Sequence, residues 1–321
     1  MKKSIIAFIA CLFAFSPAYA DGSKVVVTIK PLHSLVAAVM EGDGNEAVLL
    51  LDGSQSPHHF SLKPSQVKAM HEAKAVFYMG ENLESFMSKT LSSLPETVRR
   101  VPLENSNALS KLSVRTSGGL EDEVVEEGHE GHHHGHDEDG EHEGHHHAHS
   151  GFDMHMWMSP LNAKHMVMEI AQKLSMTFPE KRSIYFANLR TLGARLTALD
   201  DRIEKRMASL RGKPYVTFHD AYQYFEKRYG LHMVGAITLN PEHGVGAKRL
   251  RKLREKIAEM GAVCVFREPQ FDAKIVDNLL EGTEAKSGVL DSQGLDLTPG
   301  AELYFQLIEN TATGLESCFK S

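Results

Sequence analysis

Histidines at three separate places in the chain could bind a metal ion through their ring nitrogens. Two of the three places follow apolar segments that are typical of β-strands, and in open α/β sheets ligands collect beyond the carboxyl ends of the strands. The third lies among large apolar side chains beside the only tryptophan, where a histidine is often simply part of the core. The candidates are His58 with its neighbour His59, then His155, then His219.

Ten further histidines lie in an acidic, low-complexity segment. Residues 121–143 carry 11 acidic residues, and residues 129–149 carry 10 of the 19 histidines. The segment has almost no apolar residues after Val125, so we expect residues 116–151 to form a disordered loop. We interpret it as a weak secondary site for divalent metals, and a solvated spacer is the alternative. The ten are His129, His132, His133, His134, His136, His142, His145, His146, His147 and His149.

The pattern H-E-x-x-H occurs twice in this segment, at residues 129–133 and 142–146. In zinc proteases that pattern needs a stable helix to bring both histidines to one metal ion. Glycine-rich acidic sequence does not form such a helix, so we reject the protease interpretation.

One long helix is expected to position the two halves of the chain. Apolar residues between 184 and 210 recur every three or four positions, which gives one apolar stripe on a helix. Pro179 is typical of a helix start, and Gly212 with Pro214 is typical of a stop. About 30 residues give a rod of about 45 Å. We interpret the rod as a bridge between two lobes, and a core helix of a single domain is the alternative.

On each side of this helix, apolar segments with strand character alternate with helical segments, which favours the α/β class. We predict two α/β lobes, each a mostly parallel sheet flanked by helices, with a cleft between them. The predicted strands are residues 25–29, 48–51, 75–79, 98–103, 215–218, 233–238, 262–266 and 288–290. The predicted parts are a signal peptide (1–20), an N-terminal lobe (21–178), the bridging helix (179–210) and a C-terminal lobe (211–321).

The N-terminus predicts export. A basic start, an apolar run at residues 5–15 and the small residues Ala18 and Ala20 are typical of a cleaved secretion signal. The run is too short to span a membrane, and no later stretch is long enough. Lipidation at Cys11 is a weaker alternative. Cleavage after residue 20 leaves 33 basic and 42 acidic residues, a net charge of −9, which offers no nucleic-acid surface.

The mature chain keeps two cysteines, Cys264 and Cys318. An even pair in an exported protein predicts a disulfide bond, with two unpaired buried thiols as the alternative.

Several motifs give the chain a resemblance to the ZnuA family, the periplasmic zinc-binding proteins of ABC importers. The motifs are S-L-K-P-S at residues 61–65, M-H-M-W-M-S-P at 154–160, F-H-D-A-Y at 218–222, E-P-Q-F at 268–271, the late cysteine pair and the acidic histidine-rich insert. The resemblance covers essentially the whole mature chain. It implies two lobes joined by a rigid helix, no catalysis, and periplasmic capture of Zn²⁺ for an ABC zinc permease with its cytoplasmic ATPase. We expect a monomer.

The resemblance implies that His58, His155 and His219 hold zinc in the cleft. Manganese-carrying relatives have a carboxylate at the position of His219, so the imidazole favours zinc. Some relatives have a glutamate where this chain has Pro57, so a fourth ligand is open here. We rank water first, then Asp291, which matches a carboxylate ligand of the manganese-type relatives, and then His59. For an accessory site in the second lobe, His232 and His243 are alternatives.

Three rival functions remain open at this point. A hydrolytic or hydrating zinc enzyme would use the same three histidines with Glu268 as a general base. A periplasmic zinc buffer would rely on the histidine-rich loop alone. A manganese or iron carrier would share the fold.

Overall fold

The computed structural model describes residues 24–115, 120, 151–239, 241, 245–261 and 264–320. The predicted signal peptide, the ten histidines of the acidic insertion and His243 lie outside the described residues. Among the helices that are described, none is long and apolar enough to cross a membrane.

The N-terminal sheet has four parallel strands in the order β2-β1-β3-β4. The two central strands, β1 and β3, are almost completely buried because helices cover both faces of the sheet, which explains why their sequences are continuously apolar. The strands are β1 (Lys24–Val27), β2 (Glu46–Leu49), β3 (Ala75–Tyr78) and β4 (Arg99–Pro102).

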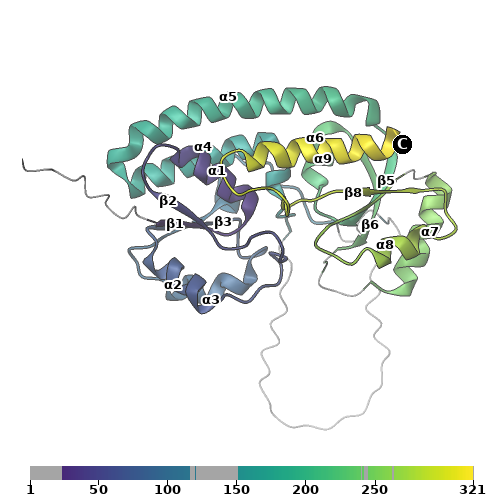
Figure 1. Ribbon diagram of the computed structural model, residues 1–321, viewed down its shortest axis with the longest axis horizontal. Helices are drawn as coiled ribbons and strands as arrows, with labels where there is room; N and C mark the ends of the chain where they lie inside the picture. Colours follow the sequence, from purple (N-terminus) through teal and green to yellow (C-terminus); the bar gives the residue numbers. More distant parts are fainter. Residues whose placement is uncertain are drawn as a thin grey trace, which may run out of the picture.

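Helices lie on both faces of this sheet (Figure 1). On one face lie α2 (Pro64–Glu72) and α3 (Ser88–Ser93), which follows a short 3-10 turn, η1 (Ser85–Met87). On the other lie α1 (Lys30–Met40) and α4 (Pro160–Thr177). Two further 3-10 turns are η2 (Leu103–Asn105) and η3 (Met156–Met158).

The C-terminal sheet repeats this topology, with four parallel strands in the order β6-β5-β7-β8. Each sheet therefore has its first strand beside its second and third, and the carboxyl ends of the strands meet at one edge. The strands are β5 (Pro214–His219), β6 (His232–Thr238), β7 (Cys264–Arg267) and β8 (Lys286–Val289). The helices of this half are α6 (Gln223–Tyr229), α7 (Ala247–Met260) and α8 (Lys274–Leu280).

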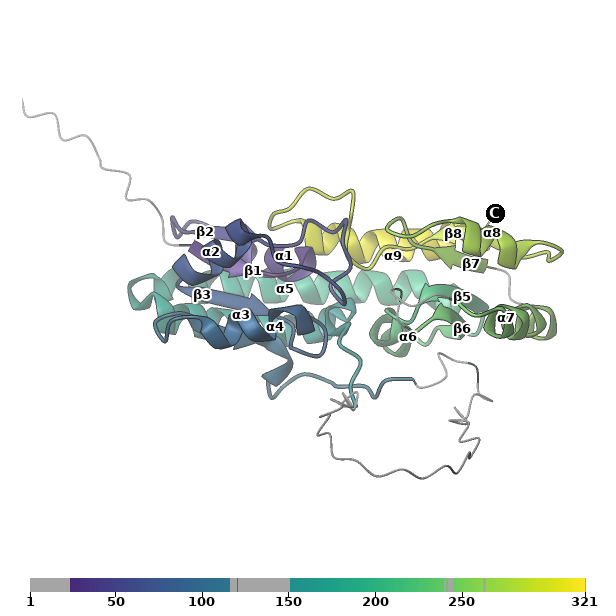
Figure 2. The same cartoon turned by 90° about the horizontal axis from the view of Figure 1, so that it is seen from below.

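The long predicted helix is present and runs along both halves of the molecule (Figures 1 and 2). It is built from the 3-10 turn η4 (Pro179–Lys181), the α-helix α5 (Arg182–Met207) and the 3-10 turn η5 (Ala208–Leu210). Gly212, with a φ of 73°, follows the last turn in a conformation that favours glycine. The bridge interpretation is confirmed, and the fold has the two parallel sheets that the sequence pattern indicates.

A second helix reinforces the bridge. The last helix, α9 (Leu303–Lys320), lies beside α5 and runs in the same direction. Arginines of α5 pair with glutamates of α9 in order along both helices: Arg195 with Glu302, Arg202 with Glu309, and Arg206 with Glu309 and Glu316. These pairs are partly solvent-exposed and each adds little stability, but their shared spacing fixes the register of the two helices.

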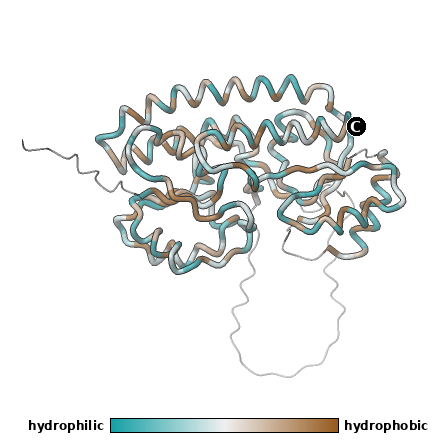
Figure 3. The backbone as a smooth tube through the Cα atoms, viewed as in Figure 1, coloured by the Kyte–Doolittle hydropathy of each residue, from teal (hydrophilic) through white to brown (hydrophobic). Residues whose placement is uncertain are grey.

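The hydrophobic core is continuous between the two halves. One cluster of buried residues includes Val25 and Phe77 of the N-terminal sheet, Leu196 of α5, and Tyr215 and Phe266 of the C-terminal sheet. Figure 3 shows the apolar strands inside both sheets, covered by helices that alternate polar and apolar residues. Because the two halves share packed side chains as well as two long helices, we expect only small movements between them.

Two expectations about local structure are wrong. Helix α2 is missing from the sequence prediction, because only Met70 of its nine residues is buried and no apolar period marks it. The sequence pattern predicts a last helix at residues 301–315 with Cys318 beyond it, but the helix runs from Leu303 to Lys320, so Cys318 lies inside it. Cys318 forms the predicted disulfide bond with Cys264 at the start of β7, with a Cα–Cα distance of 6.1 Å.

Candidate metal centre

His58 lies in the loop that connects β2 to α2. The loop begins with tight polar turns, in which Asp52 accepts hydrogen bonds from the backbone and hydroxyl of Ser54. The backbone N–H of His58 donates to Ser56 Oγ at 3.3 Å. The ring atom Nε2 of His58 is buried, and no protein group bonds to it among the described residues. A buried polar atom of this kind is expected to have a partner, and a metal ion bound by the ring nitrogen would supply one.

His155 is fixed by the carboxylate two residues before it. Asp153 Oδ1 accepts hydrogen bonds from the backbone N–H of His155 at 2.9 Å and from its ring Nδ1 at 2.8 Å. The backbone of Asp153 is held in turn, because its carbonyl accepts from Tyr224 Oη at 2.7 Å and its N–H donates to the Leu112 carbonyl at 2.8 Å. The carboxylate therefore sets both the tautomer and the orientation of the ring.

The two described segments that flank the histidine-rich insertion pair with each other next to His155. Val114 N–H donates to the Gly151 carbonyl at 3.0 Å, and Ser113 and Phe152 form an antiparallel bridge. This short ladder, residues 112–115 with 151–153, closes the base of the insertion independently of the residues between.

His219 is the last residue of β5, the strand paired on both sides within its sheet. Its ring Nδ1 lies 2.7 Å from Glu268 Oε1, which also accepts from Tyr222 Oη at 3.3 Å. Glu268 directly follows β7, so neighbouring parallel strands deliver the histidine and its carboxylate to the same edge of the sheet. His219 and Glu268 are both almost completely buried.

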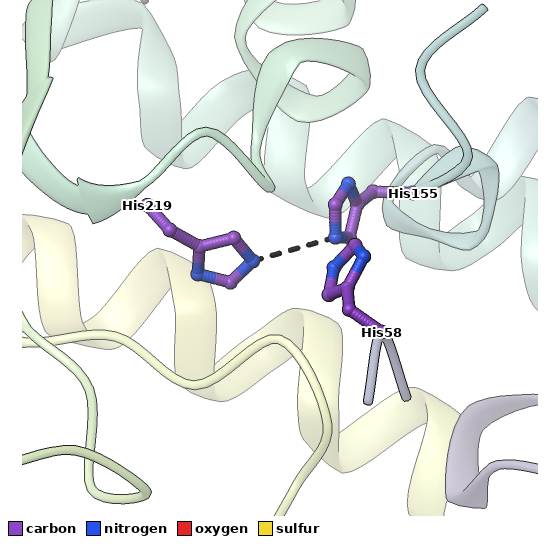
Figure 4. Close-up of side chains that lie close together, drawn as sticks. All are labelled: His58, His155 and His219. Carbon is purple, nitrogen blue, oxygen red and sulfur yellow. Dashed lines mark hydrogen bonds between the residues drawn. The ribbon is translucent and has the colours of Figure 1, made fainter. Parts of the chain in front are cut away.

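The three histidines converge in the cleft between the two halves (Figure 4). One ring nitrogen from each lies within 4.8 Å of the others, and the Nε2 atoms of His155 and His219 are 3.4 Å apart. Nitrogens on a tetrahedral zinc ion are about 3.3 Å apart, given zinc–nitrogen bonds of about 2.0 Å. Two of the three positions thus already match a zinc site, and His58 needs only a small approach.

The hydrogen bonds at Nδ1 of His155 and His219 determine whether the two Nε2 atoms can bind a metal ion. When the Nδ1–H groups of His155 and His219 donate to carboxylates, both Nε2 atoms carry lone pairs. Two lone pairs held 3.4 Å apart in a buried site repel each other unless a cation lies between them. The arrangement is therefore that of two oriented imidazole ligands, each with a carboxylate behind it.

Burial and neighbouring charges shift the pKa values of His58 and His219 in opposite directions. Burial lowers the pKa of His58 well below its usual value, and charge on His155 and His219 would lower it further, so its ring is neutral and able to bind metal. Burial also acts to lower the pKa of His219, but the charge and hydrogen bond of Glu268 outweigh burial and raise it. A cation at the centre would be favoured by the same carboxylate.

The cavity at the three rings is small. Its volume of about 20 Å³ is of the size that a water molecule or a metal ion needs, far below the roughly 300–1,000 Å³ of sites for organic ligands. Besides the histidines it is lined by Gln55, Ser56, Pro57, Pro241, Glu268, Gln270, Phe271, Ser292 and Gln293.

The remaining predicted ligands lie outside the cluster of three. His59 is exposed and does not line the cavity. The carboxylate of Asp291 accepts hydrogen bonds from three backbone N–H groups, those of Gln293, Gly294 and Leu295, and from Gln270 Nε2 at 2.8 Å. His232 is exposed at the start of β6 and lines a different hollow, beside Arg115 and Glu226.

Sequence reasoning missed two functional residues and assigned a third differently. Asp153 lies two residues before His155, and that spacing lets an aspartate accept from the N–H two positions on, a signal that could have been used. Gln270 lines the cavity, and the sequence marked it only as part of the motif E-P-Q-F, without a role. Glu268 was considered only as a general base, whereas the structure places it behind His219.

The comparisons with known proteins agree with this geometry. The family model described as zinc-uptake complex component A, periplasmic, matches residues 25–318. The high-affinity zinc uptake system protein ZnuA of Brucella abortus (strain 2308) is 40% identical over 325 residues, which cover 95% of this chain and 94% of that protein. The protein of the same name from Yersinia pestis is 34% identical over 320 residues, covering 100% and 98%.

Solved structures share the fold. The periplasmic zinc-binding protein TroA from Treponema pallidum superposes with a TM-score of 0.74 at 20% identity, covering 92% of this chain and 99% of that one. A crystal structure of ZnuA superposes with a TM-score of 0.71 at 21% identity, covering 92% and 100%.

Proposed function

This chain belongs to the ZnuA family of periplasmic zinc-uptake components, and we propose that it captures one zinc ion between its lobes with His58, His155 and His219. The family supplies zinc to an ABC importer, so the captured ion is passed to a membrane permease that is driven by an ATPase. The observation that carries the ligand assignment is the meeting of three ring nitrogens within 4.8 Å in a buried cavity.

The ligand chemistry favours zinc over manganese. Imidazole nitrogen suits zinc, whereas manganese prefers carboxylate, carbonyl and water oxygens. The described residues supply three imidazoles to this cluster and no carboxylate, because Asp153 and Glu268 are engaged behind the rings and Asp291 caps a loop. A manganese or iron carrier is therefore the less favoured reading.

Glu268 also argues against a zinc hydrolase. A general base needs a free carboxylate oxygen within reach of a zinc-bound water. Glu268 Oε1 accepts from both His219 Nδ1 and Tyr222 Oη, so this oxygen is engaged in holding the ring rather than a water molecule. We propose that the protein is a binding component without catalytic activity.

The proposal also covers the export of the chain and its oligomeric state. Residues 1–20 act as a cleaved signal peptide, which delivers the mature chain to the periplasm. The mature chain works as a monomer built from an N-terminal lobe (21–178), a bridging helix (179–210) and a C-terminal lobe (211–321). The histidine-rich segment collects metal weakly, and the cleft holds the tight site.

The function is tested in bacteria that lack their own periplasmic zinc-uptake component but keep its permease and ATPase. In medium depleted of zinc by a chelator, this chain should restore growth, and added zinc should make it unnecessary. The triple variant His58→Ala, His155→Ala, His219→Ala should be exported equally and fail to restore growth. Equal rescue by the triple variant, or rescue that follows manganese instead of zinc, would overturn the proposal.

A further inference from the structure

Two buried polar atoms without a hydrogen-bond partner among the described residues belong to side chains that line the metal cavity. They are Nε2 of His58 and Oε1 of Gln270. A bound cation would be the partner of His58 Nε2. The amide oxygen needs a separate explanation, because a buried acceptor without a donor destabilises the protein by the full cost of removing it from water.

The orientation of the Gln270 amide is fixed by chemistry. Its Nε2 donates to Asp291 Oδ1 at 2.8 Å, and a carboxylate accepts only from the amide nitrogen, not from the amide oxygen. The oxygen must therefore point away from Asp291. Gln270 also lines the cavity of the three histidines, so its unpartnered acceptor belongs to a side chain in the wall of the metal site.

Asp291 is itself immobilised. Its two oxygens accept from the N–H groups of Gln293, Gly294 and Leu295 at 2.9, 2.9 and 2.6 Å. The same loop is held from the N-terminal half by Lys30, whose Nζ donates to the carbonyls of Gly294 and Leu295 at 2.7 and 2.8 Å. Asp291 therefore serves as an anchor for the loop and for Gln270, and its oxygens are not free to bind metal.

Three imidazoles leave one position of a tetrahedral zinc ion open, and the cavity that they line is of a size that admits a water molecule. Water on a zinc ion is a strong hydrogen-bond donor, because the metal draws electron density from its oxygen. We infer that Gln270 Oε1 accepts a hydrogen bond from the water that completes the coordination of the captured zinc, so that Gln270 is a positioning residue for the fourth ligand. This inference rests on the proposed zinc site.

The role follows a chain of contacts from Asp291 through Gln270 to the water. A neutral amide holds the water without adding negative charge to the site, and water can leave more easily than a protein ligand. Such a site binds zinc with three protein bonds and retains an exchangeable position, which suits a carrier that must also release its ion.

The first test compares Gln270→Met with wild type, using zinc and, as a spectroscopic probe, Co²⁺. Methionine keeps the length of the side chain but offers no comparable acceptor. The variant should still bind one zinc ion through three histidines. Zinc should dissociate about tenfold faster, as expected for the loss of one hydrogen bond to a charged group, and the visible spectrum of the cobalt form should change because the fourth ligand is altered.

Gln223→Met is the matched control. Gln223 also has a partnered Nε2, which donates to the Ser113 carbonyl at 3.2 Å, and a buried Oε1 without a protein partner, but it does not line the metal cavity. This variant should leave the zinc dissociation rate and the cobalt spectrum unchanged. If Gln270→Met behaves like Gln223→Met while wild type binds one zinc ion, the inference about Gln270 is wrong and the zinc site stands.

A double-mutant cycle separates an anchoring from a ligating role for Asp291. If Asp291 acts through Gln270, then Asp291→Ala should speed zinc dissociation and have little further effect in a Gln270→Met background. If Asp291 were the fourth ligand, its loss would add to that of Gln270 and remove a metal–oxygen bond from the X-ray absorption spectrum. Loss of a metal–oxygen bond from the spectrum of Asp291→Ala would overturn the inference. Thermal unfolding of each variant confirms that it is folded.

Discussion

Nε2 of His155 and Nε2 of His219 lie 3.4 Å apart although 64 residues separate them in the chain. Each ring is held from behind by a carboxylate, Asp153 on one side and Glu268 on the other. The first histidine belongs to the N-terminal half, and the second is the last residue of β5 in the C-terminal half. The distance between the halves therefore sets the distance between the ligands, which is why the bridging helices matter for metal binding.

Loss of the carboxylate behind His219 should weaken zinc binding. Glu268→Ala removes the acceptor for Nδ1, so the ring can rotate and its basicity falls. Loss of a group that hydrogen-bonds to a metal-binding histidine lowers metal affinity by about 10-fold to 100-fold. Competition with a zinc-binding dye should show this loss in Glu268→Ala and a smaller loss in Glu268→Gln, which keeps an acceptor oxygen.

The control for this prediction is Glu284→Ala, which removes an exposed carboxylate from the same half of the molecule. It should bind zinc as wild type does. Wild-type affinity in Glu268→Ala would contradict a positioning role for Glu268.

Deletion of residues 121–149 should leave one tight zinc ion per chain and remove only weak binding. The flanking segments pair through Val114 with Gly151 and Leu112 with Asp153, so the base of the insertion and the support of His155 remain in place. Calorimetric titration with zinc should give fewer weak sites and an unchanged tight site. A deletion variant without any tight site would show that the insertion itself holds the ion.

A longer deletion provides the structural control. Removing residues 112–153 takes away the ladder and Asp153 together, so it should weaken the tight site as well.

Glu84 should make the zinc-free protein less stable as pH rises. Its carboxylate is fully buried, and burial raises its pKa to about 7 against the donated hydrogen bonds of Gly80, Thr28 and Met79. Between the usual value of 4.5 and about 7, the folded state holds a proton that the unfolded state has lost. The contribution is therefore present below pH 4.5 and disappears as pH rises through 7, an effect of about 3 kcal/mol.

The variant Glu84→Gln isolates this effect, because glutamine does not titrate. Urea unfolding in the presence of a chelator at pH 5, 6, 7 and 8 should show the variant gaining stability relative to wild type as pH rises. Glu96→Gln, at an exposed position in the same half, is the control and should show no such trend. A constant difference between Glu84→Gln and wild type at every pH would contradict the prediction.

Much of the fold could be predicted because it depends on local patterns. The stripe from Ile184 to Leu210 predicts α5, and the buried strands are apolar throughout because both faces of each sheet are covered. Helix α2 could not be found in this way, since a helix that is partly exposed and buries only Met70 shows no apolar stripe. The last helix is longer than predicted because the disulfide bond and the packing of Phe319 hold its final turn against the C-terminal half.

Only part of the metal site could be predicted from the sequence pattern. His58 and His219 follow strands, and that placement is a signal in itself, whereas His155 looks like a core residue until the resemblance to a family is considered. The partners behind the rings depend on contacts across the fold: Glu268 reaches His219 from 49 residues away, and Gln270 depends on an aspartate 21 residues later. Spacing in the chain carries no information about such contacts.

The most direct test of the account is the zinc affinity of His58→Ala, His155→Ala and His219→Ala, each made in the chain that lacks residues 121–149. The only tryptophan, Trp157, has its ring centroid 5.2 Å from that of His155 and reports on the site by fluorescence. The parent should bind one zinc ion tightly, each of the three variants should bind at least about a hundredfold more weakly, and His71→Ala should match the parent. Parent-like affinity in any of the three variants would contradict the account.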